Sequence, residues 1–156
     1  MSTFEEWAIH IPVTEPLCLV LGAGVTDDGK LDEVSQRRCE HGIARAMKEG
    51  ETIVVSAGAI PHRPDIRKTL GGLMAEYLRS RGFHRVVVLS TAPTFNARGE
   101  VVAITHYLEG YLSSVVGQEQ KLRRVRVFVR RLYNRHFARS VTFVAVPGED
   151  LTCWGH

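Results

Sequence analysis

Long hydrophobic runs are missing from this sequence. No stretch approaches the roughly 18 to 20 consecutive apolar residues that a membrane-spanning helix needs. Glu5 and Glu6 follow Met1 closely, where a secretory signal peptide would carry basic residues and then an apolar segment. We therefore expect a cytoplasmic protein that does not engage a membrane.

Cysteine is scarce as well. The chain has three, Cys18, Cys39 and Cys153, and they are too widely spaced to form a Cys-x-x-Cys pair, which argues against zinc and redox motifs of that type. Apart from His136, the histidines show no spacing that would assemble a metal site from local sequence. The sequence predicts free thiols and no metal.

Two motifs of enzymes and nucleotide-binding proteins are absent or incomplete. There is no Gly-x-Ser-x-Gly nucleophile elbow, so a serine hydrolase has little support. The glycine turn at 22–24 lacks the third glycine of a dinucleotide fingerprint and the lysine of a P-loop. On its own, this turn is weak evidence for a nucleotide.

The composition is that of an ordinary globular protein, with 44% hydrophobic and 24% charged residues. A chain of 156 residues suits one domain, and at that size folding buries roughly two thirds of the unfolded surface. No internal repeat or linker interrupts it. We expect a single α/β domain over residues 1–156, with its core at about 16–148.

Strand patterns alternate with helix patterns along the chain. Short β-branched runs predict five strands, at 17–21, 52–56, 86–89, 125–129 and 141–146. Apolar stripes at helical spacing predict long helices at 39–47, 66–78 and 101–115, and Gly50 and Gly82 end the first two. Crossovers of this length force parallel pairing. The expected fold class is α/β, a Rossmann-like three-layer sandwich with a mainly parallel five-stranded sheet.

Ligands bind such sheets outside the carboxyl ends of the strands. In the first loop predicted there, the glycines of Gly22-Ala23-Gly24 let backbone N–H groups approach an anion, although a plain structural turn fits these residues equally well. At the second loop, Ser56 is the last residue of the strand predicted at 52–56, and Gly58 follows that strand. Small residues that fit a crowded junction are the alternative interpretation, and the favoured one for Ser56 alone.

Two further loops add polar and charged side chains. Asn96 either hydrogen-bonds a ligand or caps the following helix. His136 and Arg139, three residues apart after the strand expected at 125–129, would point the same way on a helical turn. An imidazole beside a guanidinium suits a phosphate or carboxylate, and His136 is the candidate general acid or base for any reaction.

Taken in order, these loops resemble the YdcF-like family of bacterial proteins, also called SanA-like or ElyC-like, which is largely unassigned in function. The resemblance covers about residues 16–148 and rests on Val20-Leu21-Gly22-Ala23-Gly24-Val25, Asp28-Gly29-Lys30-Leu31, Arg38, Val55-Ser56-Ala57-Gly58, Thr94-Phe95-Asn96 and His136-Phe137-Ala138-Arg139. It implies a Rossmann-like fold, a polar pocket, and binding of S-adenosylmethionine or a nucleotide. Ala57 departs from the family, which usually has glycine there. The family also usually has an acidic residue early in the second helix, near Leu70-Gly71, and this sequence has none at that place.

We expect a protein that binds a small anionic ligand, either nucleotide-like or another phosphate- or carboxylate-bearing metabolite, with hydrolase or transferase activity left open. The predicted lining is Gly22, Ala23, Gly24, Ser56, Gly58 and Asn96, with charge from Arg38, His136 and Arg139. The alternative is a nucleic-acid-binding module that uses the arginine-rich segment 123–139. A net charge of +3 and the apolar residues of 125–129 argue against this alternative. A scaffold for a protein partner is a third reading.

Overall fold

The computed structural model describes residues 16–55, 65, 68–88, 112–132 and 141–148. The described part contains five strands and three helices. In chain order they are β1 (Leu17–Val20), α2 (Glu33–Glu49), β2 (Thr52–Val55), α3 (Leu70–Ser80), β3 (Val86–Val88), β4 (Leu112–Gly117), α5 (Glu119–Leu132) and β5 (Thr142–Ala145).

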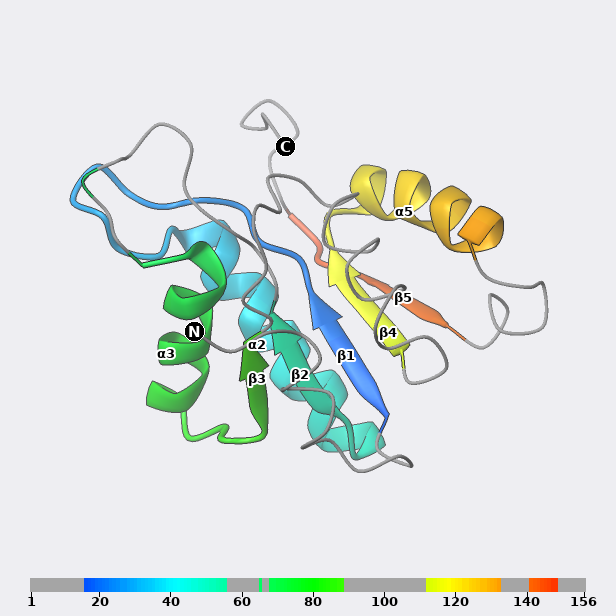
Figure 1. Ribbon diagram of the computed structural model, residues 1–156, viewed down its shortest axis with the longest axis horizontal. Helices are drawn as coiled ribbons and strands as arrows, with labels where there is room; N and C mark the ends of the chain where they lie inside the picture. Colours follow the sequence, from blue (N-terminus) through cyan, green and yellow to red (C-terminus); the bar gives the residue numbers. More distant parts are fainter. Residues whose placement is uncertain (1–15, 56–64, 66–67, 89–111, 133–140, 149–156) are drawn as a thin grey trace.

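All five strands form one parallel sheet in the order β3-β2-β1-β4-β5 (Figure 1). This order belongs to a Rossmann-like fold, and the expected α/β fold class is confirmed. Every residue of β1 and β2 is buried. Strands covered on both faces read as continuous apolar runs, which is why the sequence pattern identified these two correctly.

The helices begin and end at residues with clear local signals. Asp32 caps α2, and its carboxylate accepts the N–H of Ser35 at 2.7 Å, while Thr69 caps α3 in the same way. Gly50 and Gly82 follow α2 and α3 with φ of 68° and 87°. Glycine adopts this left-handed conformation without a steric penalty, so the two predicted helix ends are confirmed.

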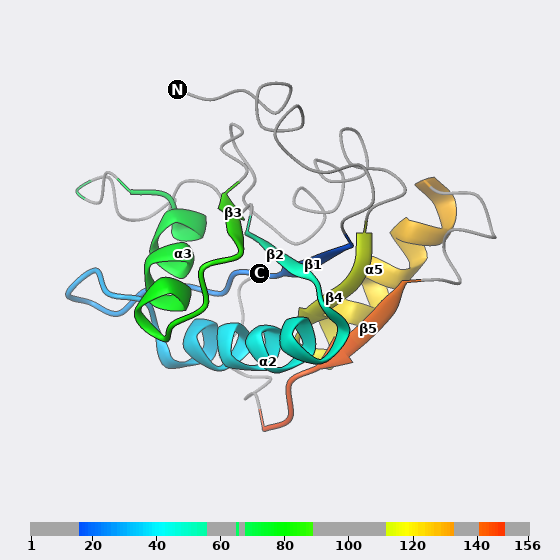
Figure 2. The ribbon, with the colours of Figure 1, turned by 90° about the horizontal axis from the view of Figure 1, so that it is seen from below.

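Different helices cover the two halves of the sheet. α2 and α3 pack against each other and against the half formed by β1, β2 and β3 (Figures 1 and 2), whereas α5 lies along β4 and β5. Right-handed crossovers that leave the centre toward opposite edges place their helices on opposite faces. The sheet is therefore the middle layer of a sandwich.

The strand predicted at 125–129 is wrong, because these residues belong to α5. Val125, Val127 and Val129 stand at every second position, as in a strand with one side less buried, but only two of the three valines are buried. Val125 and Val129 are each 1% exposed and share a helical stripe with Leu122, while Val127 is 45% exposed. The apolar pattern thus fitted both periods, and the helical period is the one the core uses.

The helix predicted at 101–115 is also wrong at its end, where Leu112–Gly117 forms β4. This strand pairs with β1 on one side and β5 on the other, and its residues are buried except for Ser113. A central position in the sheet outweighs the helical spacing of Leu112 and Val115. The rest of that predicted helix, 101–111, lies outside the described residues.

In the part of the chain that the structure describes, none of the helices is both long enough and apolar enough to span a membrane.

Candidate functional site

The carboxyl ends of β1 and β4 meet at the centre of the sheet, where the order of the strands reverses. β1 leads through α2 to β2, and β4 leads through α5 to β5, so the two connections leave in opposite directions. Doubly wound sheets bind ligands at such a switch point, because the loops diverge there. The two strand ends are joined by a hydrogen bond from the N–H of Leu21 to the carbonyl of Val116, at 3.0 Å.

The segment that follows β1 is a short hairpin. Val25 and Leu31 form an antiparallel bridge, and Gly29 turns the chain with φ of 82°. At its base, the N–H of Asp32 donates to the carbonyl of Gly24 at 3.1 Å. The hairpin therefore returns the chain to the glycine turn just where α2 begins.

Two amides of the glycine turn are engaged by a side chain. The N–H groups of Ala23 and Gly24 both donate to Oγ of Ser35, at 3.2 and 3.0 Å, and Ser35 is fully buried. An anion at these two amides would compete with the hydroxyl. This contact favours the structural interpretation for Ala23 and Gly24, while Gly22 stays a predicted ligand contact.

Ser35→Ala is expected to lower the free energy of unfolding by about 1 kcal/mol, because the buried N–H of Ala23 loses its acceptor. Urea unfolding measures the change. Ser80→Ala is the matched control, since the Ser80 hydroxyl donates to the carbonyl of Tyr77 at an exposed position and its loss should change little. Equal effects in the two variants would contradict a role for Ser35 in holding the turn.

Arg38 brings a buried positive charge to the end of β1. The residue is 3% exposed, and its Nη1 donates to the carbonyls of Gly22 at 2.7 Å and Leu21 at 3.3 Å. The structure thus places Arg38, one of the predicted site residues, directly against the predicted glycine turn. The guanidinium both fixes the turn and contributes positive potential at this edge of the sheet.

β4 passes into α5 with almost no loop. Gly117 ends the strand, and a Cβ there would lie 2.8 Å from Cδ1 of Leu21, so glycine allows the two strand ends to approach closely. The carbonyl of Gln118 already accepts the N–H of Leu122 at 2.9 Å as the first bond of the helix. The N-terminus of α5, with its partial positive charge, therefore lies at the switch point.

Gln118 stands out among the buried polar residues. It is 3% exposed, and its Nε2 is a buried side-chain atom for which no hydrogen-bond partner exists in the described part of the protein. A buried amide without a partner costs about 1 to 3 kcal/mol. An acceptor atom of a ligand at the switch point would satisfy it.

Lys121 adds a further positive charge in the first turn of α5. Partial burial lowers the pKa of its ammonium, and the neighbouring charges of Arg124 and Arg38 lower it further. The effect of Arg38 on the pKa of Lys121 is consistent with the pairing of β1 and β4, which brings the ends of these two strands together. An anion bound there would relieve the repulsion among these groups.

Most of the predicted site falls outside the described residues. Gly22, Ala23, Gly24 and Arg38 lie together at the end of β1, as expected. Outside the described part are Ser56, Gly58, Asn96, His136 and Arg139. For these five, the role in the site stays a prediction.

The sequence patterns did not point to Gln118 and Lys121, and they included Arg124 only in the arginine-rich segment 123–139. His136 and Arg139 were assigned to the fourth loop because a strand was expected at 125–129. With β4 at Leu112–Gly117, the residues that follow strand four are Gln118 and the first turn of α5. Gly117 was the available signal, since a glycine after an apolar run marks the end of a strand.

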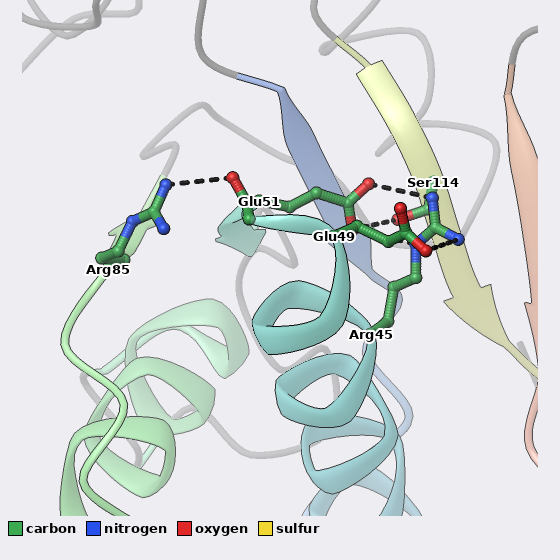
Figure 3. Close-up of polar contacts among 6 residues, drawn as sticks. Arg45, Glu49, Glu51, Arg85 and Ser114 are labelled. Atoms are coloured by element: carbon green, nitrogen blue, oxygen red, sulfur yellow. Dashed lines mark hydrogen bonds and ion pairs between the residues drawn. The ribbon is translucent and has the colours of Figure 1, made fainter.

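The opposite, amino-terminal edge of the sheet holds a buried ion pair (Figure 3). Glu51 is fully buried and accepts two hydrogen bonds from Arg45, from Nε at 3.0 Å and from Nη2 at 3.2 Å. The hydroxyl of Ser114 donates to the same carboxylate at 3.1 Å. Burial raises the pKa of the nearby Cys18 thiol to about 12, so it stays protonated at neutral pH. These contacts tie β1, α2, β2 and β4 together and have a structural role.

A hollow of about 240 Å³ lies on the outer surface of α2, with Arg37, Glu40, His41 and Ala44 among its lining residues. Glu40 accepts a hydrogen bond from the hydroxyl of Tyr77 at 3.2 Å and pairs with Arg81 at 3.1 Å. Its mixed charges suit an anion poorly. Among the described residues, no group of histidine, cysteine and acidic side chains is arranged to hold a metal ion.

Comparisons of the chain with protein families, with curated proteins and with solved structures gave no match.

Proposed function

We propose that this protein binds a small anionic metabolite, nucleotide-like or otherwise carrying a phosphate or carboxylate, at the switch point between β1 and β4. The observation that carries the proposal is the unpartnered, buried amide of Gln118 beside the N-terminus of α5. A helix N-terminus attracts anions, and a buried hydrogen-bond donor without a partner is stabilised when a ligand supplies an acceptor atom.

The charges at the same edge support an anion rather than a neutral ligand. Arg38 and Lys121 approach it from different helices, and the pKa of Lys121 is lowered in part by Arg38. Without a ligand these cations repel one another. A bound phosphate or carboxylate turns that repulsion into attraction, and the lowered pKa means that affinity falls with rising pH sooner than for an ordinary lysine.

The proposal also covers the class of ligand and a role in catalysis. The resemblance to the YdcF-like family favours S-adenosylmethionine or a nucleotide. His136 remains the proposed general acid or base of a hydrolase or transferase reaction. We also propose a cytoplasmic location, which the buried, unpaired thiols of Cys18 and Cys39 favour.

Lys121→Met is expected to weaken ligand binding by roughly 10- to 100-fold, the value of one charge-assisted hydrogen bond. Binding is measured by calorimetric titration and thermal shift with AMP, ADP, S-adenosylmethionine and glucose 6-phosphate. Lys48→Met is the matched control. Lys48 is an exposed lysine in the last turn of α2, so this variant loses the same charge on a different part of the surface.

Gln118→Met tests the amide separately. Removing a buried donor that has no partner should weaken binding without lowering the free energy of unfolding. The proposal fails if the wild-type protein binds none of the four probes. It also fails if Lys121→Met binds as tightly as Lys48→Met.

A further inference from the structure

α5 carries a concentration of positive charge that extends well beyond its first turn, where the proposed ligand site uses Lys121. Its 14 residues include six that are basic and one, Glu119, that is acidic. Five of the basic residues are arginines, Arg123, Arg124, Arg126, Arg130 and Arg131. A segment with this balance produces a strong local positive potential even though the net charge of the protein is only +3.

The helix turns its apolar side to the core and its basic side outward. Leu122, Val125 and Val129 are at most 4% exposed, whereas the Arg123 side chain is 74% exposed. Arg124 and Arg126 are exposed too. Because the apolar stripe is already packed on the sheet, this helix cannot insert such a stripe into a lipid surface.

Little of this charge is neutralised within the described part of the protein. Arg123 pairs with Glu119 at 3.5 Å, across two side chains that are each at least 70% exposed. No carboxylate among the described residues pairs with Arg124 or Arg126, and Arg126 instead lies 4.9 Å from the centre of the Phe143 ring. An exposed pair of this kind contributes little and yields readily to a competing anion.

We propose that the outer face of α5 binds the phosphodiester backbone of nucleic acid without reading its sequence. Arginine, rather than lysine, dominates the helix, and its planar guanidinium matches a phosphate with two parallel hydrogen bonds. The helix rises about 12 Å from Arg123 to Arg131. That length faces roughly seven phosphate charges of a duplex. The proposal does not depend on the small-ligand site, which uses the N-terminus of the helix.

The experiment measures the affinity of the wild-type protein and two variants for a fluorescein-labelled DNA duplex, by fluorescence anisotropy from about 50 mM to about 200 mM sodium chloride. Arg123→Glu reverses one charge on the face of α5. Arg79→Glu reverses an exposed arginine in the last turn of α3 and changes the net charge equally. Arg123→Gln is added in case the reversal impairs folding.

The wild-type protein should bind the duplex with a steep dependence on salt. Arg123→Glu should weaken binding about tenfold at the lower salt concentration and reduce the slope of log affinity against log salt by about 1. Arg123→Gln should have a smaller effect in the same direction, and Arg79→Glu should change affinity less than about twofold.

Three outcomes would overturn the proposal. One is a wild-type protein that does not bind the duplex or binds it without salt dependence. Another is equal weakening by Arg123→Glu and Arg79→Glu, which would show that only net charge matters. The third is binding to vesicles of phosphatidylserine and phosphatidylcholine in the absence of binding to DNA, which would assign the face to a membrane.

Discussion

Replacing Arg45 with methionine is expected to lower the free energy of unfolding by about 3 to 5 kcal/mol. Arg45 is the partner of a carboxylate, that of Glu51, which has no exposure to solvent. Methionine fills similar space but leaves the buried carboxylate without its cation, and among the described residues the hydroxyl of Ser114 is then its remaining hydrogen-bond partner. Urea unfolding at unchanged m-value measures the loss.

The control is the same substitution in an exposed ion pair. Arg81 contacts Glu40 at 3.1 Å, with both side chains about half exposed, so Arg81→Met should cost less than about 1 kcal/mol. A second test adds Glu51→Gln to Arg45→Met, which removes the buried charge and should restore part of the stability. A small loss in Arg45→Met, or no recovery in the double variant, would show that the ion pair does not hold this edge of the sheet.

Gly42→Ala is expected to lower the free energy of unfolding by about 1 to 2 kcal/mol, although alanine is the better helix former by about 1 kcal/mol. Gly42 lies in the middle of α2, and a Cβ there would be 2.6 Å from Cγ2 of Val20 in β1. Val20 is fully buried and stiff at its branched Cβ, so α2 would have to move away from the sheet.

Whether Gly42→Ala lowers or raises the free energy of unfolding should depend on the residue at position 20. In a Val20→Ala protein the clashing methyl group is gone, and Gly42→Ala should then raise the free energy of unfolding. Thermal and urea unfolding of the four proteins in this cycle give the coupling between the two sites. If Gly42→Ala destabilised both backgrounds equally, close packing of α2 on β1 would not be the reason for the glycine.

The candidate site could be predicted in part from the sequence. The end of β1 was correctly located because an apolar run followed by Gly22 and Gly24 is a local signal, and Arg38 was included in the prediction through a family resemblance. Gln118 and Lys121 were not included, because their place in the proposed site depends on β4 lying next to β1. Ser35 was missed for a similar reason, since its contacts with Ala23 and Gly24 bridge 12 and 11 positions along the chain, respectively.

What the sequence by itself determined is the alternation of strands and helices and the parallel sheet. β1 and β2 are buried on both faces and so are apolar except for Thr52, and Gly50 and Gly82 end helices by a conformation that depends on the residue itself. Only the tertiary structure decided that Leu112–Gly117 is a strand and Glu119–Leu132 a helix. The apolar residues of both segments fit the period of a strand as well as that of a helix. Which segment becomes the strand depends on which one pairs with β1 and β5, and these strands are distant along the chain.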